Sequence, residues 1–277
     1  MSTQDKSSSK KTDQKINFLK RLNLRFPWLK LAAVIVVGII IILDLLDLTI
    51  SKTGELSPYV KVPMSNHIKA TERQIKEKKL VALTFDDGPS PDTTPELLDN
   101  LTKKDAVATF FVLGSMADAN PDIVKRIRKN GHDVASHTMY HQNLVMISYG
   151  AAADDIGIAN GVFTQILGHS PELTRPPYGN LNNNVVELID TPIILWSVDP
   201  QDWLYKDPDI VISNVMAQVH DGAIILLHDI YPSTVEAVPA LIDSLRESGY
   251  EVATISELTK ARGVHLTTGE IYYNFEP

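Results

Sequence analysis

From Leu80 onward, short apolar runs alternate with segments in which apolar residues recur every three or four positions. The short runs are typical of buried strands, and the periodic segments predict amphipathic helices. Strands are predicted at residues 80–85, 108–114, 132–137, 172–177, 191–199 and 222–229, and residues 250–258 predict a last strand that leads into a terminal helix. Helices are predicted at residues 94–105, 120–131, 148–167, 182–189, 207–219 and 233–248.

These strands are too apolar to have one face in solvent. Strands of this kind, separated by helices, belong in a parallel sheet that is covered by helices, so the pattern predicts an α/β fold. An open doubly wound sheet and a closed barrel both fit the alternation. No GxGxxG sequence follows the first strand, so a dinucleotide-binding version of the fold is not supported.

A different pattern precedes this alternation. Residues 31–43 form an uncharged apolar run, which reaches Ile50 if Asp44 and Asp47 are included. A membrane helix needs about 20 apolar residues, and the shorter run also fits the apolar region of a signal peptide. Since no convincing cleavage site follows Leu43, we expect an uncleaved membrane helix.

Charge orients this expected anchor. Residues 1–30 carry eight Lys or Arg against two Asp, a net charge of +6, which predicts a cytoplasmic N-terminus and an exported C-terminal body. These patterns predict a basic cytoplasmic tail (1–30), a transmembrane signal-anchor (31–50), an extracellular stalk (51–78), a main domain (79–265) and a C-terminal tail (266–277).

Composition narrows the partners and the chemistry. The whole chain carries −8, so the part after residue 30 carries −14, and such an acidic body argues against a nucleic-acid partner. The chain contains no cysteine, which excludes disulfides, thiolate metal sites and a cysteine nucleophile. Any metal ion must therefore be bound by His, Asp or Glu.

Ionisable and aromatic residues collect where the predicted strands end. They are Asp86 and Asp87, His137 and His141, Arg175 and Tyr178, Asp199, Asp202 and Trp203, and His228 and Asp229. In barrels of alternating strands and helices, the carboxyl ends of the strands form the active site. The adjacent carboxylates of Asp86 and Asp87 repel each other unless a cation lies nearby. Two imidazoles and one carboxylate suffice to bind a catalytic divalent metal, so the aspartate pair would supply the third ligand.

Five short sequences carry a family resemblance. "TFDDGP", "HTMYH", "RPPYG", "DPQDW" and "LLHD", in this order, resemble the five motifs of the polysaccharide deacetylases, carbohydrate esterase family 4. The surrounding sequence most resembles that of bacterial peptidoglycan N-acetylglucosamine deacetylases. The resemblance implies a distorted (β/α) barrel of about seven parallel strands, here preceded by the N-terminal membrane helix. It also implies that residues 79–265 form a metal-dependent hydrolase domain that acts on carbon–nitrogen (amide) bonds.

The resemblance further implies the metal ligands and the catalytic base. Asp87, His137 and His141 would bind the metal, and Asp86 would be the general base, held by Arg175. Zn²⁺ is the natural ion for such a ligand set, with Co²⁺ and Ni²⁺ as alternatives.

The remaining motif residues would protonate the leaving group, stabilise the oxyanion and bind the acetyl group. His228 would be the general acid, paired with Asp202. The backbone N–H of Tyr178 would face the developing oxyanion, and Trp203 and Leu226 would line the pocket for the acetyl group.

An anchored and exported enzyme favours a substrate just outside the membrane. We therefore expect the N-acetyl group of N-acetylglucosamine in peptidoglycan to be hydrolysed, with N-acetylmuramic acid as another target. An O-acetyl esterase, or a deacetylase of chitin or another polysaccharide, would use the same motifs. A non-catalytic glycan-binding protein is the remote alternative, and it would be expected to lack Asp86 or His228, which are both present. The expected location is the cell membrane, with a single span and an extracellular catalytic domain.

Overall fold

The computed structural model describes residues 79–277, so the expected tail, membrane helix and stalk (1–78) lie outside the described residues. Within residues 79–277, no helix is both long enough and apolar enough to cross a membrane. The strands are β1 (Lys79–Asp86), β2 (Thr109–Val112), β3 (Asp133–Ser136), β4 (Ile193–Ile194), β5 (Ile224–His228), β6 (Tyr250–Ala253) and β7 (Ile271–Tyr272).

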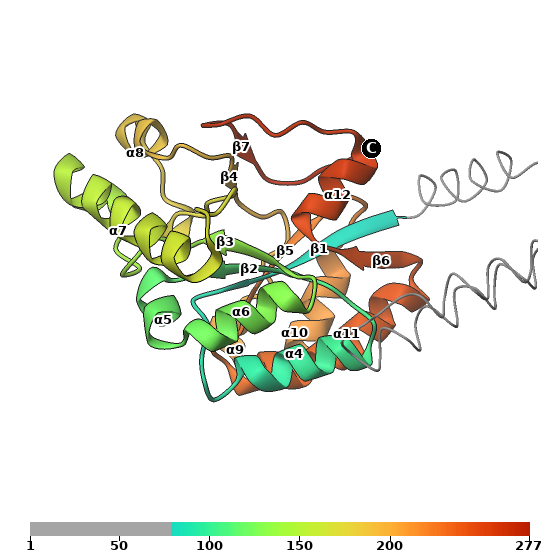
Figure 1. Cartoon of the computed structure of the whole chain (residues 1–277). Helices are drawn as coiled ribbons and strands as arrows, with labels where there is room; N and C mark the ends of the chain where they lie inside the picture. The colour runs from blue at the N-terminus through green and yellow to red at the C-terminus, as the bar shows by residue number, and fades with distance from the viewer. Residues whose placement is uncertain (1–78) are drawn as a thin grey trace, which may run out of the picture. The chain divides into compact units, whose positions relative to one another are not determined.

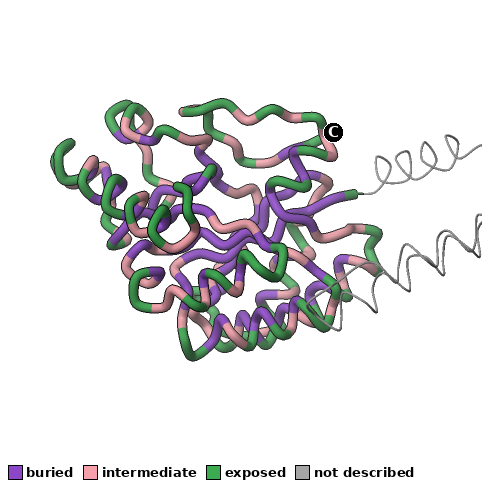
Figure 2. The backbone as a smooth tube through the Cα atoms, viewed as in Figure 1, coloured by how far each residue is buried: buried purple, intermediate pink, exposed green. Residues whose placement is uncertain are grey.

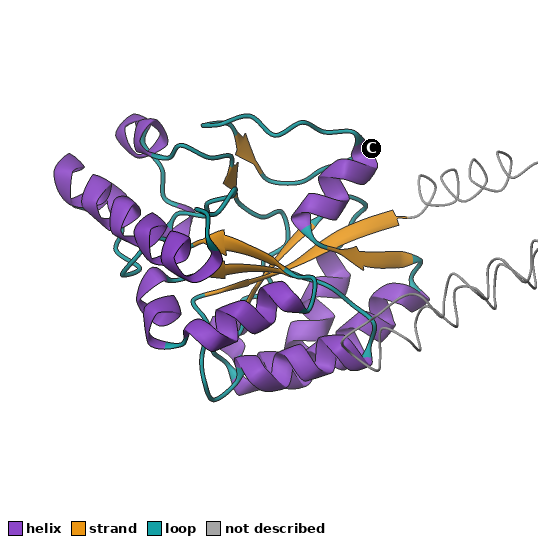
Figure 3. Cartoon of the chain, viewed as in Figure 1, coloured by secondary structure: helices purple, strands orange, loops and turns teal. Residues whose placement is uncertain are grey.

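Helices connect and cover these strands (Figures 1 and 3). The α-helices are α4 (Thr94–Lys103), α5 (Gly114–Ala119), α6 (Pro121–Lys129), α7 (Tyr149–Leu167), α8 (Asn183–Leu188), α9 (Asp202–Tyr205), α10 (Pro208–Gln218), α11 (Pro232–Glu247) and α12 (Ile255–Arg262). Two short 3-10 helices, η1 (Leu144–Met146) and η2 (Pro177–Gly179), lie in loops.

Strand β1 is the centre of a parallel sheet with the order β3-β2-β1-β5, and β6 also pairs with β1. Isolated parallel bridges continue the pairing from Ser136 to Thr174 and from Thr174 to Ile193, and Val198 then pairs with Ile225 of β5. The pairing thus returns to the strand beside β1. This arrangement is an α/β fold with a parallel, barrel-like sheet, which confirms that part of the predicted fold class. Within the described residues the strands form a five-stranded and a two-stranded sheet, and the predicted membrane helix lies outside these residues.

The two faces of β1 belong to two apolar cores. Val81, Leu83 and Phe85 pack in the cluster that also contains buried residues of α4, α6, α10 and α11. Leu80 and Ala82 pack in a second cluster with Phe111, Ile194 and Phe275. Every residue of β1 except Lys79 is buried, and buried positions gather at the centre of the fold (Figure 2). The prediction that the strands have no solvent face is confirmed for β2, β4 and, apart from Lys79, for β1. Strands β3 and β6 contain half-buried residues.

The structure differs from the sequence predictions at several elements. The predicted strand at 172–177 contributes only a bridge at Thr174, because Pro176 and Pro177 have no N–H to donate. Helices α5 and α9 were not predicted. The expected C-terminal tail contains β7, which pairs with β4, and Phe275, which is buried against the sheet.

Candidate metal centre

The backbone at the end of β1 brings the carboxylates of Asp86 and Asp87 close to the same histidine. Side chains alternate along a strand, so Asp86 lies on the face of Thr84 and opposite to Phe85. Asp87 would ordinarily point away from Asp86, but its φ of 75° turns the chain. As a result, Asp86 Oδ2 and Asp87 Oδ1 lie 3.7 and 3.5 Å from the same atom, Nε2 of His137.

Asp87, His137 and His141 form the candidate metal centre. One ligand atom from each residue lies within 4.8 Å of the other two, and Asp87 Oδ1 is 3.2 Å from His141 Nε2. Nδ1 of His137 is 2.7 Å from the carbonyl oxygen of Arg175, which can only accept a hydrogen bond. Nδ1 therefore carries a hydrogen, and Nε2 is the ring nitrogen that faces the cluster.

A divalent cation fits these residues. Asp87 Oδ1 is buried and has no hydrogen-bond partner, although an unpaired buried oxygen costs free energy. It lies beside two imidazole nitrogens, and a carboxylate with two imidazoles is a three-ligand set that leaves a position open on the ion.

The protonation tendencies agree with metal binding. Burial would raise the pKa of Asp87, but the interaction with His137 and the charges of His228 and His141 outweigh burial and lower the pKa. Burial lowers the pKa of His141, and the charge of Asp87 offsets this only in part. An ionised carboxylate and a neutral imidazole are the forms that bind metal.

Arg175 holds the carboxylate of Asp86 in place beside the candidate metal centre. Its guanidinium is fully buried, and Nη1 donates to Asp86 Oδ1 at 2.6 Å and to Thr84 Oγ1 at 2.9 Å. Nε and Nη2 donate to the carbonyl oxygens of Ile194 and Leu195. All these bonds leave Asp86 Oδ2 as the carboxylate oxygen that faces the metal centre.

His228, at the end of β5, is held by Asp202. Nδ1 of His228 donates to Asp202 Oδ1 at 2.8 Å, and the backbone N–H of His228 donates to Oδ2 at 2.8 Å. Thr234 and the N–H of Trp203 complete the hydrogen bonding of the carboxylate. Burial alone would lower the pKa of His228, but the hydrogen bond and charge of Asp202 raise it to about 9. The imidazole is therefore cationic at neutral pH.

The other predicted residues lie at the same end of the strands. Tyr178 is 60% exposed, and its ring meets that of His141 edge-on at 4.6 Å between centroids. Trp203 is exposed on α9, and Leu226 is buried in β5. Asp199 accepts from the N–H of Gln201 within its own turn.

Unusual backbone conformations collect in the motifs. Among the described residues, seven non-glycine residues have positive φ, and five of them lie in the motif segments: Asp87, Thr138, His141, Tyr178 and Gln201. Such conformations cost about 1–3 kcal/mol each and cluster at functional sites. In these segments, unfavourable backbone conformations are therefore accepted where they place the motif side chains.

Sequence reasoning missed Asp155. This residue of α7 is buried, and its Oδ1 accepts from the N–H of Met139 at 2.7 Å, inside the segment that carries His137 and His141. The only sequence signal is a charged residue among the apolar positions of a helix, which does not identify its partner.

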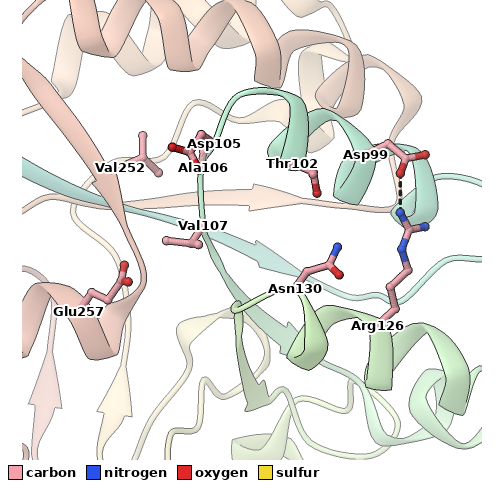
Figure 4. Close-up of a pocket in the computed structure, with 9 residues that line it drawn as sticks. All are labelled: Asp99, Thr102, Asp105, Ala106, Val107, Arg126, Asn130, Val252 and Glu257. Carbon is pink, nitrogen blue, oxygen red and sulfur yellow. Dashed lines mark hydrogen bonds and ion pairs between the residues drawn. The ribbon is translucent and has the colours of Figure 1, made fainter. Parts of the chain in front are cut away.

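A cavity of about 620 Å³ lies at the opposite end of the strands (Figure 4). It is lined by residues before β2, in the last part of α4 and at the start of α12, and the lining includes the ion pair of Arg126 with Asp99 at 2.5 Å. None of the predicted site residues lines it. The candidate chemistry therefore lies at the carboxyl ends of the strands, away from this cavity.

Comparison with known proteins identifies relatives. The family model described as polysaccharide deacetylase matches residues 73–191. Peptidoglycan-N-acetylglucosamine deacetylase PgdA of Listeria monocytogenes is 44% identical over 200 residues, which cover 72% of this chain and 42% of PgdA. Peptidoglycan-N-acetylmuramic acid deacetylase PdaC of Bacillus subtilis is 38% identical over 185 residues, or 67% of this chain and 40% of PdaC. The chain thus spans about two fifths of these relatives.

Further matches cover more of the related chain. A peptidoglycan-N-acetylglucosamine deacetylase of Bacillus cereus is 40% identical over 196 residues, which are 66% of this chain and 71% of that protein. The structure titled T48 deacetylase with substrate has a TM-score of 0.68 and 35% identity, covering 72% of this chain and 98% of its own. A family 4 acetyl xylan esterase from Clostridium thermocellum, in complex with cobalt, has a TM-score of 0.67 and 32% identity, covering 71% and 98%. The chain belongs to the polysaccharide deacetylase family, carbohydrate esterase family 4.

Proposed function

We propose that this protein is a metal-dependent deacetylase that hydrolyses the N-acetyl group of N-acetylglucosamine in peptidoglycan. One observation carries the proposal: the three-ligand cluster of Asp87, His137 and His141 lies beside Asp86, whose carboxylate is held by Arg175. The activities for which PgdA and the Bacillus cereus relative are named support this substrate.

The residues divide the work of amide hydrolysis. A divalent ion at the candidate metal centre would supply Lewis acidity, which polarises a carbonyl and acidifies water. Asp86 Oδ2 accepts the proton of the attacking water, while Arg175 holds Oδ1. The backbone N–H of Tyr178 stabilises the negative charge on the former carbonyl oxygen. The C–N bond then breaks, and His228 Nε2 donates its proton to the leaving amine, so the products are acetate and a free amino sugar.

Zn²⁺ is the ion that we propose, since a three-ligand set of carboxylate and imidazoles suits it. Co²⁺ and Ni²⁺ are alternatives for the same ligands, and the Clostridium thermocellum esterase was solved with cobalt. Trp203 and Leu226 would bound the acetyl pocket.

Two other substrates have specific support. PdaC is named for N-acetylmuramic acid and is 38% identical to this chain, and the acetyl xylan esterase is named for an ester substrate. N-acetylglucosamine is preferred because the relatives named for it reach higher identity, 44% for PgdA and 40% for the Bacillus cereus protein.

For the location, we propose a single-pass anchor in the cell membrane, with the catalytic domain outside the cell. The apolar segment 31–50 and the basic segment 1–30 support this topology. Protease added to intact cells should digest the catalytic domain and spare an epitope tag at the N-terminus. Digestion of the tag in intact cells would contradict the topology.

The test of the reaction is mass spectrometry of peptidoglycan fragments incubated with the full chain, with and without a chelator. We expect the mass of one acetyl group to be lost from N-acetylglucosamine, to stop with the chelator and to return with Zn²⁺. Loss only from the lactyl-bearing sugar would assign N-acetylmuramic acid, and loss only of ester-linked acetyl would assign an esterase. No loss from any fragment would contradict a hydrolase.

The pH dependence tests the acid. Because His228 must be protonated to donate, we expect kcat to fall as pH rises through about 9, the raised pKa of this imidazole. Asp202→Asn removes the largest of the charges that raise the pKa of His228, so the falling limb should move to lower pH. The measurement is the pH profile of kcat for both proteins. An unmoved limb in Asp202→Asn would assign it to another group.

A further inference from the structure

The buried carboxylate of Asp229, the last residue of the motif "LLHD", takes no part in the proposed reaction. Asp229 directly follows His228 at the end of β5 and is 1% exposed. Burial raises the pKa of Asp229 to about 7, and the hydrogen bond from Thr94 opposes this only in part. Its Oδ1 has no hydrogen-bond partner. Burying a carboxyl oxygen without a hydrogen-bond partner costs free energy, so a structural or functional role is expected for Asp229.

Hydrogen bonds connect Asp229 to the loop between β1 and α4, which carries Asp87. Thr94 Oγ1 donates to Asp229 Oδ2 at 2.5 Å and accepts from the N–H of Ser90 at 2.8 Å. Thr93 Oγ1 donates to the backbone oxygen of Asp229 at 2.5 Å. Asp229 is thus bonded directly to Thr93 in the loop and to Thr94, the first residue of α4, and through Thr94 it is connected to Ser90. The two direct bonds are tertiary contacts, because about 135 residues separate their partners in the sequence.

The carboxylate also lies directly against the backbone next to Asp87. A Cβ atom placed on Gly88 would stand 2.2 Å from both oxygens of Asp229, far inside any van der Waals contact. Only glycine allows this approach. The carbonyl oxygen of Gly88 accepts from the N–H of Leu113 at 3.0 Å, after β2. The residue after Asp87 is therefore held between the ends of β5 and β2.

We propose that Asp229 is a positioning residue for the metal centre: through Thr94 and its contact with Gly88, it fixes the loop that presents Asp87 to His137 and His141. This inference rests on the proposed metal site. Asp87 needs such support because its own φ of 75° is unfavourable and its Oδ1 has no hydrogen-bond partner. A metal ligand that must be held in place gains affinity from groups that restrain it.

The experiment measures Co²⁺ binding to the metal-free full chain by visible absorption, in competition with a chelating dye. Asp229→Ala should weaken Co²⁺ affinity about 10–100-fold, the range found when the support of a ligand is removed. Asp229→Asn keeps an oxygen that accepts from Thr94 and should retain most of the affinity.

Two further variants test the same contact at Thr94, the first residue of α4. Thr94→Val keeps the shape of the buried side chain but removes the hydroxyl, so it should weaken Co²⁺ binding, while Thr94→Ser should not. Both substitutions remove the same hydrogen bond between Thr94 and Asp229. The double variant Asp229→Ala with Thr94→Val should therefore bind Co²⁺ no more weakly than the weaker-binding single variant. Thr94→Val also carries the test if Asp229→Ala does not fold.

The matched control is Asp221→Ala. Asp221 likewise joins β5 to β1, since its Oδ1 accepts from the N–H of Leu80 at 2.8 Å and from Arg262, but it lies at the other end of the strands. This change should lower the midpoint of thermal unfolding and leave Co²⁺ affinity as in the wild type.

The outcomes separate the two proposals. If the wild-type chain binds no Co²⁺, the proposed metal site is wrong. If it binds Co²⁺ and both Asp229→Ala and Thr94→Val bind it equally well, the positioning role of Asp229 is wrong. Equal weakening in Asp221→Ala would also overturn that role, because the effect would then follow stability alone.

Discussion

Asp86→Asn is expected to lower kcat about 10²–10⁴-fold, the usual contribution of a general base. The asparagine keeps the shape of the side chain but cannot take a proton from water. Since the proposed ligand is Asp87 and not Asp86, Co²⁺ affinity should change far less than kcat. The measurements are acetate release from peptidoglycan fragments and Co²⁺ titration, both on the full chain.

The informative control is Asp87→Asn. This neighbour lies equally close to His137, within 0.2 Å in the distances to Nε2, yet its change should remove both Co²⁺ binding and turnover. A chain in which Asp86→Asn abolished Co²⁺ binding and Asp87→Asn did not would reverse the two roles. A glycan-binding protein without activity would be indifferent to Asp86→Asn.

Local signals predicted most of the regular structure. Helix α6 lies within the predicted 120–131, where Pro121 occupies its first turn, and α7 lies within the predicted 148–167 despite three glycines. Those glycines are tolerated because a Cβ there would meet nothing within 4 Å, so they open no hole in the core. Strong apolar periodicity and end signals act within one element, and for this reason they can be read from the sequence.

Short elements were missed where tertiary contacts define them. Helix α9 begins at Asp202, whose carboxylate is bound to His228 and Thr234 from later parts of the chain. Strand β7 has two residues and pairs with β4 across the sequence. Neither element has enough residues for an internal period, so no local pattern could identify it.

The candidate site was partly predictable for a related reason. Parallel strands place their carboxyl ends together, so residues that follow several strands are predicted to converge. The structure does bring together Asp87, His137 and His141. The sequence could not show that positive φ at Asp87 turns its carboxylate toward His137, nor that Asp155 supports the segment of His137 and His141. Both depend on backbone geometry that contacts between distant residues impose.

Arg175→Met should be the most destabilising single change near the site. The guanidinium is fully buried and its donors bind Asp86, Thr84 and two backbone carbonyls. Removing one partner of a buried ion pair leaves the other charge uncompensated and costs about 3–5 kcal/mol. For a domain of this size, that corresponds to a fall of roughly 6–20 °C in the unfolding midpoint.

Urea unfolding of three variants isolates the cause. Arg126→Met breaks an ion pair of similar length with Asp99, 2.5 Å against 2.6 Å, but both of its side chains are partly exposed, so it should cost about 0–1 kcal/mol. Arg175→Lys should recover little, because an ammonium group cannot reproduce the planar fork. Adding Asp86→Asn to Arg175→Met should restore part of the lost stability, since the uncompensated charge is then gone. Equal costs for Arg175→Met and Arg126→Met would show that burial does not strengthen the pair, and Asp86 would then need another explanation for its fixed position.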